Sequence, residues 1–596
     1  MRRTSVQTLL LSSAIAAGVC GAVSCTDSDY DLGEVDMTLG IGSGELSIPA
    51  SSSDTIRLKE VLKFKDSEVV DTVDGGDYVF SKDGDPVSPA RPFVSRVTVS
   101  QRDRKSFDFG IDLTPYIAAK PHGRRTLPIH FEQEAVVNTF DFDGSLPDGV
   151  EDLKWADVSS QMTLRVEFPA VIAHFVGTIA SMSIELPDYI DFTASSSVPG
   201  VTKAGNRLTL TGVSTAQPLT LTLSVSRINF GKAATSLGSL AITPEREVQL
   251  DGKVSMAVTI NEINLAPTTF NPADCKITSA LEMSSDITLT KVNGRFNPDI
   301  DLGDMGGANV TGIPDFLTED GVVIDLANPT ILLGISSDLP VRGFVSGKLT
   351  ATKGGRETSV VTIPEMTVSE NAASRICICR DRSLLSGAAS YTEVVEVPNL
   401  SDLLNPIPDR IDFKGVARAD KDNSYDFELG RRYTVQPSYR IEAPLAFGPK
   451  AVIVYSDVFD GWNKDITDYD VTDGTYVELT ANVENRVPAF LHVEATPLDA
   501  AGRDMPDSQV KVEVTGTVAA CPQGADKTVT PVTIRLTPAK GALKNLDGLR
   551  FKVSGSAKDP DGNSVVSGVT LNARRHSLVA RDIRVKLVGT AVADLN

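Results

Sequence analysis

Hydrophobic and polar residues alternate along much of this chain with a period of two. Clear runs cover residues 207–211, 219–223, 254–260 and 510–514. A period of two places successive side chains on opposite faces of an extended strand, so that one face is buried and the other meets water. Thr, Val, Ile and Leu dominate these runs, and Gly, Pro, Asn and Asp bound them, as is typical of antiparallel strands.

Helical periodicity is limited to short stretches. Residues 54–64 are one example, with Asp54 placed to cap the first turn and apolar residues at Ile56, Leu58, Val61, Leu62 and Phe64. The pattern therefore predicts an all-β protein, built from tandem antiparallel β-sandwich (Ig-like) modules with short connecting helices.

A longer motif occurs twice. It consists of V-E-[FV]-P, a short helical stretch and [IL]-P-D-x-I-D-F, and it spans residues 166–192 and 395–413. Proline ends a strand ladder because it lacks an amide hydrogen, and it suits the first turn of a helix. The copies continue to match downstream, but their offset falls from about 220 to about 150 residues. We therefore predict a duplicated module with an insertion near 235–305 in the first copy.

The length of 596 residues allows about three to five domains. The hydrophobic share of 41% and the charged share of 23% are typical of folded domains with a core. We predict five segments, which are a lipoprotein signal peptide (1–24), an acidic and Gly-rich tether (25–44), an N-terminal β module (45–165), a first sandwich repeat (166–394) and a second (395–596).

The first residues have the pattern of a secretion signal. Arg2 and Arg3 precede an uncharged apolar run at 9–23, which is short for a membrane span. The following Ala22-Val23-Ser24-Cys25 resembles the lipobox of bacterial lipoproteins. This resemblance implies cleavage after Ser24 and a diacylglycerol on the Cys25 thiol; an ordinary cleaved signal is the alternative. No later run approaches 18 apolar residues, so we expect no transmembrane helix.

A serine- and aspartate-rich run follows Cys25 and contains Asp27, Asp29 and Asp31. It resembles the surface-export signal of Bacteroidota lipoproteins, and the chain as a whole resembles their uncharacterised multi-module surface lipoproteins. The resemblance implies an outer-membrane protein, anchored in lipid through acylated Cys25 and facing the extracellular side. A solvated acidic spacer, on a protein of the periplasmic face, is the alternative.

Sequence motifs for catalysis are missing. The five histidines show no metal-binding or catalytic spacing, and no G-x-S-x-G elbow, P-loop or dinucleotide fingerprint occurs. We therefore expect a non-enzymatic protein without a cofactor, with a hydrolase of unrecognised type as the alternative. The net charge of −21 argues against a general nucleic-acid binder.

Two acidic turns, at 420–426 and 559–563, have oxygen ligands at the alternating spacing that calcium accepts, but Asp-rich and Asp-Gly sequences also form plain turns. We predict no metal site. Cys275, Cys377, Cys379 and Cys521 are expected to be buried thiols, because Cys377 and Cys379 lie on one strand face, where a disulfide between them is strained.

Phe459 and Trp462 form an aromatic pair among loop-type polar residues. On a rigid loop such residues stack on a sugar or anchor a partner; in the alternative interpretation they plug the core beneath the loop. We predict a binding or structural module for a glycan or protein ligand. A second hypothesis is an envelope-assembly component that binds partner proteins by strand pairing.

Overall fold

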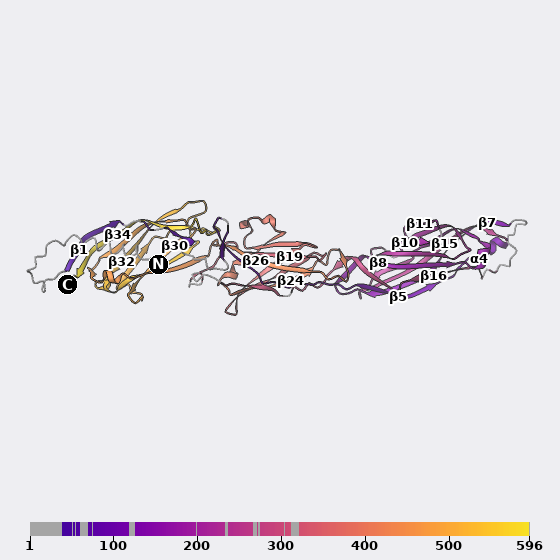
Figure 1. Cartoon of the computed structure of the whole chain (residues 1–596), viewed down its shortest axis with the longest axis horizontal. Helices are drawn as coiled ribbons and strands as arrows, with labels where there is room; N and C mark the ends of the chain where they lie inside the picture. The colour runs from indigo at the N-terminus through magenta and orange to yellow at the C-terminus, as the bar shows by residue number, and fades with distance from the viewer. Residues whose placement is uncertain are drawn as a thin grey trace, which may run out of the picture.

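The computed structural model describes residues 38–49, 52–53, 55–59, 70–73, 75–118, 125–197, 199–232, 236–265, 271, 274–302, 304–311, 317 and 321–594. Nearly every element in these ranges is a β-strand, and the few helices are one or two turns long. The predicted all-β class with short connecting helices is confirmed. Figure 1 shows an elongated molecule with three groups of strands along its length.

The terminal module contains both ends of the described chain. One of its sheets has the order β1-β34-β29-β32-β31, with β2 and β28 also paired to β34, and the facing sheet has the order β27-β33-β30. Its elements are β1 (Thr38–Pro49), β2 (Ile56–Arg57), β27 (Val452–Phe459), α5 (Asn463–Ile466), β28 (Tyr469–Val471), β29 (Tyr476–Asn485), β30 (Phe490–Asp499), β31 (Val510–Thr515), β32 (Thr528–Pro538), η8 (Ala542–Lys544), β33 (Leu546–Ser556) and β34 (Ser577–Asp594).

The middle module is a second sandwich. Its sheets have the orders β18-β24-β20-β21 and β23-β22-β19-β26-β4-β3. Its elements are β3 (Val70–Thr72), β4 (Tyr78–Asp83), β18 (Asp304–Asn309), β19 (Thr330–Ser337), β20 (Gly343–Lys353), β21 (Arg356–Val368), β22 (Ala373–Cys379), η5 (Arg382–Leu384), η6 (Ala388–Ser390), β23 (Glu393–Glu396), η7 (Leu400–Leu404), β24 (Arg410–Ala419) and β26 (Val435–Pro444).

The distal module is one large sheet with the order β10-β13-β8-β17-β5-β7-β15-β9-β12-β11, joined by β6, β14, β16 and β25. Its elements are β5 (Val97–Ser106), β6 (Phe109–Gly110), α3 (Thr114–Ala118), β7 (Thr126–Ser145), β8 (Val150–Glu167), α4 (Ala170–Phe175), β9 (Thr178–Glu185), β10 (Ile190–Ser196), β11 (Val201–Ala204), β12 (Arg207–Ser214), β13 (Leu219–Asn229), β14 (Gly238–Ile242), β15 (Glu247–Asn264), β16 (Lys276–Met283), β17 (Asp286–Phe296) and β25 (Tyr425–Glu428).

The chain runs out along the molecule and returns. It starts in the terminal module, passes through β3 and β4 of the middle module, forms the distal module, and comes back through the middle to end beside its start. Strands β1 and β34 pair antiparallel, with Thr38 opposite Asp594 and Pro49 opposite Arg584. In Figure 1 the indigo β1 therefore lies beside the yellow β34, at the end opposite β7 and β15.

The sheets group residues differently from the predicted linear segments. The predicted boundary at 165/166 lies inside β8, and the one at 394/395 lies inside β23. The predicted insertion near 235–305 contains β15 and β17, two inner strands of the distal sheet. Part of the predicted tether, from Thr38 onward, is strand β1. The physical reason is that sheet hydrogen bonds join segments far apart in sequence, which repeats along the chain do not reveal.

The repeated motif forms similar but not identical structure in its two copies, because the first has an α-helix followed by β9 and the second has a 3-10 helix with no strand before β24. Pro169 precedes α4 and Pro398 precedes η7, and the Pro-Asp pairs lead directly into β10 and β24. The alternating residues of both strands face inward, since Ile190, Phe192, Ile411 and Phe413 are buried. In the predicted helix at 54–64, Ile56–Arg57 instead form β2 and residues 58–59 are helical, while Asp54 and 60–64 lie outside the described residues.

Strand β25 joins the middle and distal modules. Its chain neighbours β24 and β26 belong to the middle module, yet it pairs with β17 of the distal sheet, with Phe427 opposite Val292. The Phe427 ring stacks on Phe296 at 4.6 Å between centroids and lies 4.9 Å from Tyr433. Because Phe427 is fully buried, the two modules share a core at this point.

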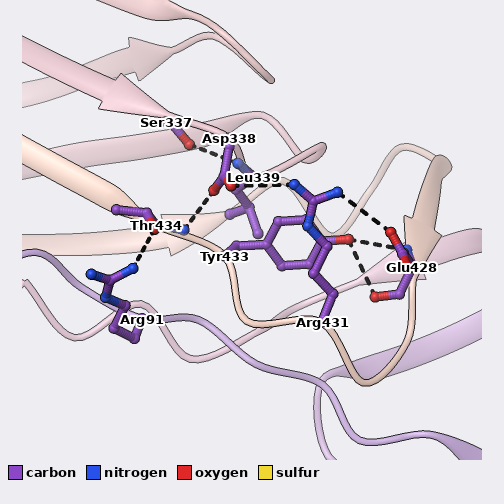
Figure 2. A network of polar contacts seen from close by, with 8 residues as sticks. All are labelled: Arg91, Ser337, Asp338, Leu339, Glu428, Arg431, Tyr433 and Thr434. Atoms are coloured by element: carbon purple, nitrogen blue, oxygen red, sulfur yellow. Dashed lines mark hydrogen bonds and ion pairs between the residues drawn. The ribbon is translucent and has the colours of Figure 1, made fainter.

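A polar network lies around Tyr433, whose ring packs against Phe427 (Figure 2). The Asp338 carboxylate accepts hydrogen bonds from the Thr434 amide (2.5 Å) and from Arg431 (3.4 Å). Arg431 also reaches Glu428 (3.4 Å), and Arg91 donates to the Thr434 hydroxyl (2.6 Å). The segment between β25 and β26 is thereby held to Asp338, which follows β19, and to Arg91, which lies in the connection between β4 and β5.

We expect Phe427→Ala to lower the free energy of opening this junction by about 3–5 kcal/mol, since it removes a fully buried ring that packs against both modules. Native-state hydrogen exchange of the β17 and β25 amides measures the effect. Phe107→Ala, at a ring that is 45% exposed, is the matched control and should leave these amides unchanged. Equal exchange in both variants would contradict the shared core.

Candidate functional site

The predicted anchor and export residues lie outside the described part of the chain. This applies to the signal peptide at 1–24 and to Cys25, Asp27, Asp29 and Asp31. Among the described residues, no helix has both the length and the apolar character needed to cross a membrane.

Phe459 and Trp462 lie together in the terminal module. Phe459 is the last residue of β27, and its ring meets Phe551 edge-on at 5.4 Å between centroids. Trp462 precedes α5, is half-buried, and packs against a small cluster formed by Ile466, Met505, Val510, Ala542 and Leu546. Both aromatic side chains line one cavity between the two sheets of the module.

This cavity has a volume of about 660 Å³, and its walls are almost entirely apolar. Both sheets and the segment after β2 contribute side chains. The wall residues are Ile56, Leu58, Phe447, Ile453, Tyr455, Asp457, Phe459, Trp462, Val477, Leu479, Val487, Ala489, Leu491, Ile534, Leu536, Leu549, Phe551, Val553, Gly555, Leu571, Leu578 and Val585.

The alternation of the strands produces these walls. On β27, for example, every second residue from Ile453 to Phe459 lines the cavity. Yet residues such as Val477 and Leu479 are only partly buried, whereas Leu164 and Ile184 in the distal module are completely buried. The side chains of the two facing sheets therefore do not fill the space between them.

The cavity is open to solvent, since its wall includes the exposed residues Ile56 and Asp457. An apolar occupant that removes the aliphatic and aromatic walls from water therefore gains about 25 cal/mol for each Å² of apolar surface that it buries.

The loop that carries Trp462 is held firmly against β33. The Asp547 carboxylate accepts hydrogen bonds from the amides of Gly461 (3.2 Å) and Asn463 (2.9 Å), while the Trp462 amide donates to the Asp547 carbonyl (2.8 Å). Gly461 has a φ of 89°, a left-handed conformation that favours glycine. The indole thus has a defined position at one end of the cavity.

The edge of the cavity carries a charge. Asp457 is exposed, and its carboxylate accepts hydrogen bonds from the Val458 amide (2.9 Å) and from the Tyr455 hydroxyl (3.4 Å). The remaining wall residues are uncharged. The site therefore combines a hydrocarbon interior with one acidic group at its margin.

A buried histidine lies where the terminal module meets the middle module. Burial, with Arg575 nearby, lowers the pKa of His576 to about 4. Its Nδ1 accepts a hydrogen bond from the Asn572 amide (2.9 Å), and the Asn572 side chain donates to Asp77 (2.7 Å). This neutral imidazole lies between the cavity-wall residues Leu571 and Leu578 in the sequence.

The four cysteines from Cys275 onward are free and buried, which confirms the prediction of buried thiols. Burial raises the pKa of Cys377 to about 12 and that of Cys275 to about 11, so these thiols stay protonated and unreactive. In the acidic turn at 420–426, the Asp420 carboxylate accepts from the Asp422 amide, the Asn423 amide group and the Tyr425 hydroxyl. Those internal donors use the oxygens that a cation would need.

Sequence reasoning found two residues of the cavity wall and missed the rest. The strand alternation contained a usable signal, because it identified which residues face inward. It did not indicate that the side chains of the two facing sheets leave a cavity between them, because that depends on how far apart the sheets lie.

No protein-family model and no curated protein matches the chain. Among solved structures, the chain is similar to a crystal structure of a "putative secreted protein from Parabacteroides distasonis", at 15% sequence identity and a TM-score of 0.34. The match covers 48% of this chain and 82% of that chain. At this level the likeness carries no argument about fold or function.

The pKa of His576 predicts a pH-dependent stability. Between pH 6.5 and about 4 the unfolded chain binds a proton on this imidazole that the folded chain does not, so acidification favours unfolding. The contribution is fully present above pH 6.5, and about 3 kcal/mol is lost as the pH falls to 4.

Urea unfolding of wild type and His576→Gln across this pH range tests the prediction. The variant should lose this part of the pH dependence. His492→Gln, at a side chain that is 54% exposed, is the control and should retain it. Identical pH profiles for wild type and His576→Gln would show that the imidazole does not couple to folding.

Proposed function

We propose that this protein is a non-enzymatic, lipid-anchored protein of the outer membrane that faces the extracellular side. In this proposal the terminal module sits next to the anchor, and the middle and distal modules project outward as a binding or structural element for a glycan or protein ligand. The observation that carries the proposal is the pairing of β1 with β34.

This pairing sets the direction of the molecule. Thr38, the first residue of β1, follows Cys25 by only 13 residues and lies opposite Asp594. The strands of the distal module lie at the other end of the elongated molecule (Figure 1). An anchor on Cys25 therefore attaches next to the terminal module and leaves the distal module far from the membrane.

The junction at β25 supports the same function. An elongated protein that presents its far end to a ligand needs rigid connections between its modules. The distal and middle modules share both a core and a paired strand at this point. The absence of catalytic motifs in the sequence is the reason for retaining a non-enzymatic role.

Strand pairing with partner proteins is less well supported. Strand β21 forms an edge of its sheet, but it carries Pro364 and Glu365. A proline and a charge on an edge strand hinder the addition of a further strand. We therefore favour presentation of a folded surface over strand addition.

Protease treatment of intact cells tests the proposed location. We expect wild type to be digested and the Asp27→Ala, Asp29→Ala, Asp31→Ala triple variant to be protected, because the variant lacks the acidic run that resembles an export signal. Both proteins should be digested after cell lysis, which is the control for intrinsic protease sensitivity.

Protection of both proteins until lysis would contradict the surface location and place the modules on a periplasmic face. A Cys25→Ala variant tests the anchor separately. It should leave the membrane fraction, and full retention there would rule out anchoring through Cys25.

A further inference from the structure

The cavity of the terminal module has no role in presenting the distal module, so it calls for a function of its own. We propose that it binds the hydrocarbon chain of a neutral or zwitterionic amphiphile, with the chain between the two sheets and the headgroup beside Asp457. The inference stands on the cavity alone and holds whether or not Cys25 is acylated.

The volume and walls of the cavity indicate a hydrocarbon ligand. About 660 Å³ lies within the range of roughly 300–1,000 Å³ that is typical of small-molecule sites. Aliphatic and aromatic side chains from both sheets surround the space, and they offer almost no hydrogen-bonding groups to a polar molecule. A sugar in this space would lose its hydrogen bonds to water without replacing them.

The length of the cavity favours a chain over a compact ring system. Wall residues extend along β33 from Leu549 to Gly555 and along β27 from Ile453 to Phe459. At about 3.3 Å per residue, six residue steps correspond to about 20 Å. An extended acyl chain lies along such a space and contacts both sheets over its whole length.

The charge at the edge selects the headgroup. Asp457 is the charged residue of the wall and is exposed, and the whole chain has a net charge of −21. A fatty-acid carboxylate would be repelled there. A hydroxyl or an ammonium group can instead donate a hydrogen bond to the Asp457 carboxylate.

The chain's own residues 60–69 are the competing occupant. They follow the wall residue Leu58 and include Val61, Leu62 and Phe64. If this segment filled the cavity, a free amphiphile would find no space, so the test must separate the two cases.

The test uses the chain from Cys25 to Asn596 with Trp155→Phe, which leaves Trp462 as its sole tryptophan. The probe is a monoacylglycerol with a brominated 16-carbon chain, which quenches an indole that it contacts. We expect saturable quenching of Trp462, and about tenfold weaker binding of the free fatty acid with the same chain. Asp457→Asn should remove most of that difference.

Val553→Phe places a larger side chain in the cavity and should weaken binding of the probe about tenfold or more. Val458→Phe is the matched control. It introduces the same change at a side chain that is 44% exposed and does not line the cavity, and it should bind like the parent. If Val553→Phe does not fold, as judged by its thermal midpoint, Leu479→Thr replaces an apolar wall side chain with a smaller, polar one and should also weaken binding.

Two results would overturn the proposal. One is an absence of saturable quenching in the Trp155→Phe chain. If quenching then appeared only after Val61, Leu62 and Phe64 were replaced by Ser, the cavity would be assigned to the chain's own segment. The other is an unchanged affinity in the folded Val553→Phe or Leu479→Thr variant.

Discussion

The antiparallel pairing of the first described strand with the last is the constraint on which the architecture depends. Strand β1 pairs with β34 along almost its whole length, from Thr38 opposite Asp594 to Pro49 opposite Arg584. Because the two ends of the chain must meet, everything between them forms an outward and a returning path. The middle module is consequently built from both paths, with β4 of the outward path beside β26 of the return.

The distal and terminal modules differ in how fully their interiors are filled. In the distal module, residues such as Met162 and Leu210 are fully buried. In the terminal module, inward-facing apolar residues such as Val477 and Leu479 are only partly buried and line a cavity. Hydrophobic and polar residues alternate in the strands of both modules, so this pattern alone does not determine whether an interior is filled.

The sequence was sufficient for the strands, the fold class and the local motif, because each depends on neighbours along the chain. The alternation that predicted residues 219–223 as a strand is the alternation of burial in β13. Proline after β8 and β23 ended those strands as expected. The module boundaries could not be predicted from the sequence, because the partner of a strand such as β1 lies more than 500 residues away.

The candidate site, like the fold, could be predicted only in part from the sequence. Phe459 and Trp462 were identified from the chain because aromatic residues in a polar loop are unusual, and they do border the cavity. Their role as wall residues could not be predicted, because it requires Val553, Leu479 and Ile534 from distant strands. A site lined by inward-facing strand residues has the same alternating sequence pattern as a filled hydrophobic core.

The out-and-back path also determines an order of events during synthesis. The distal sheet draws most of its strands from one continuous stretch, residues 97–296, and can form soon after that stretch emerges. The terminal module must wait for β34, although β1 is synthesised before the other described strands. Until β34 is synthesised, β1 lacks the strand with which it pairs, so a chain truncated before β34 cannot complete this sheet.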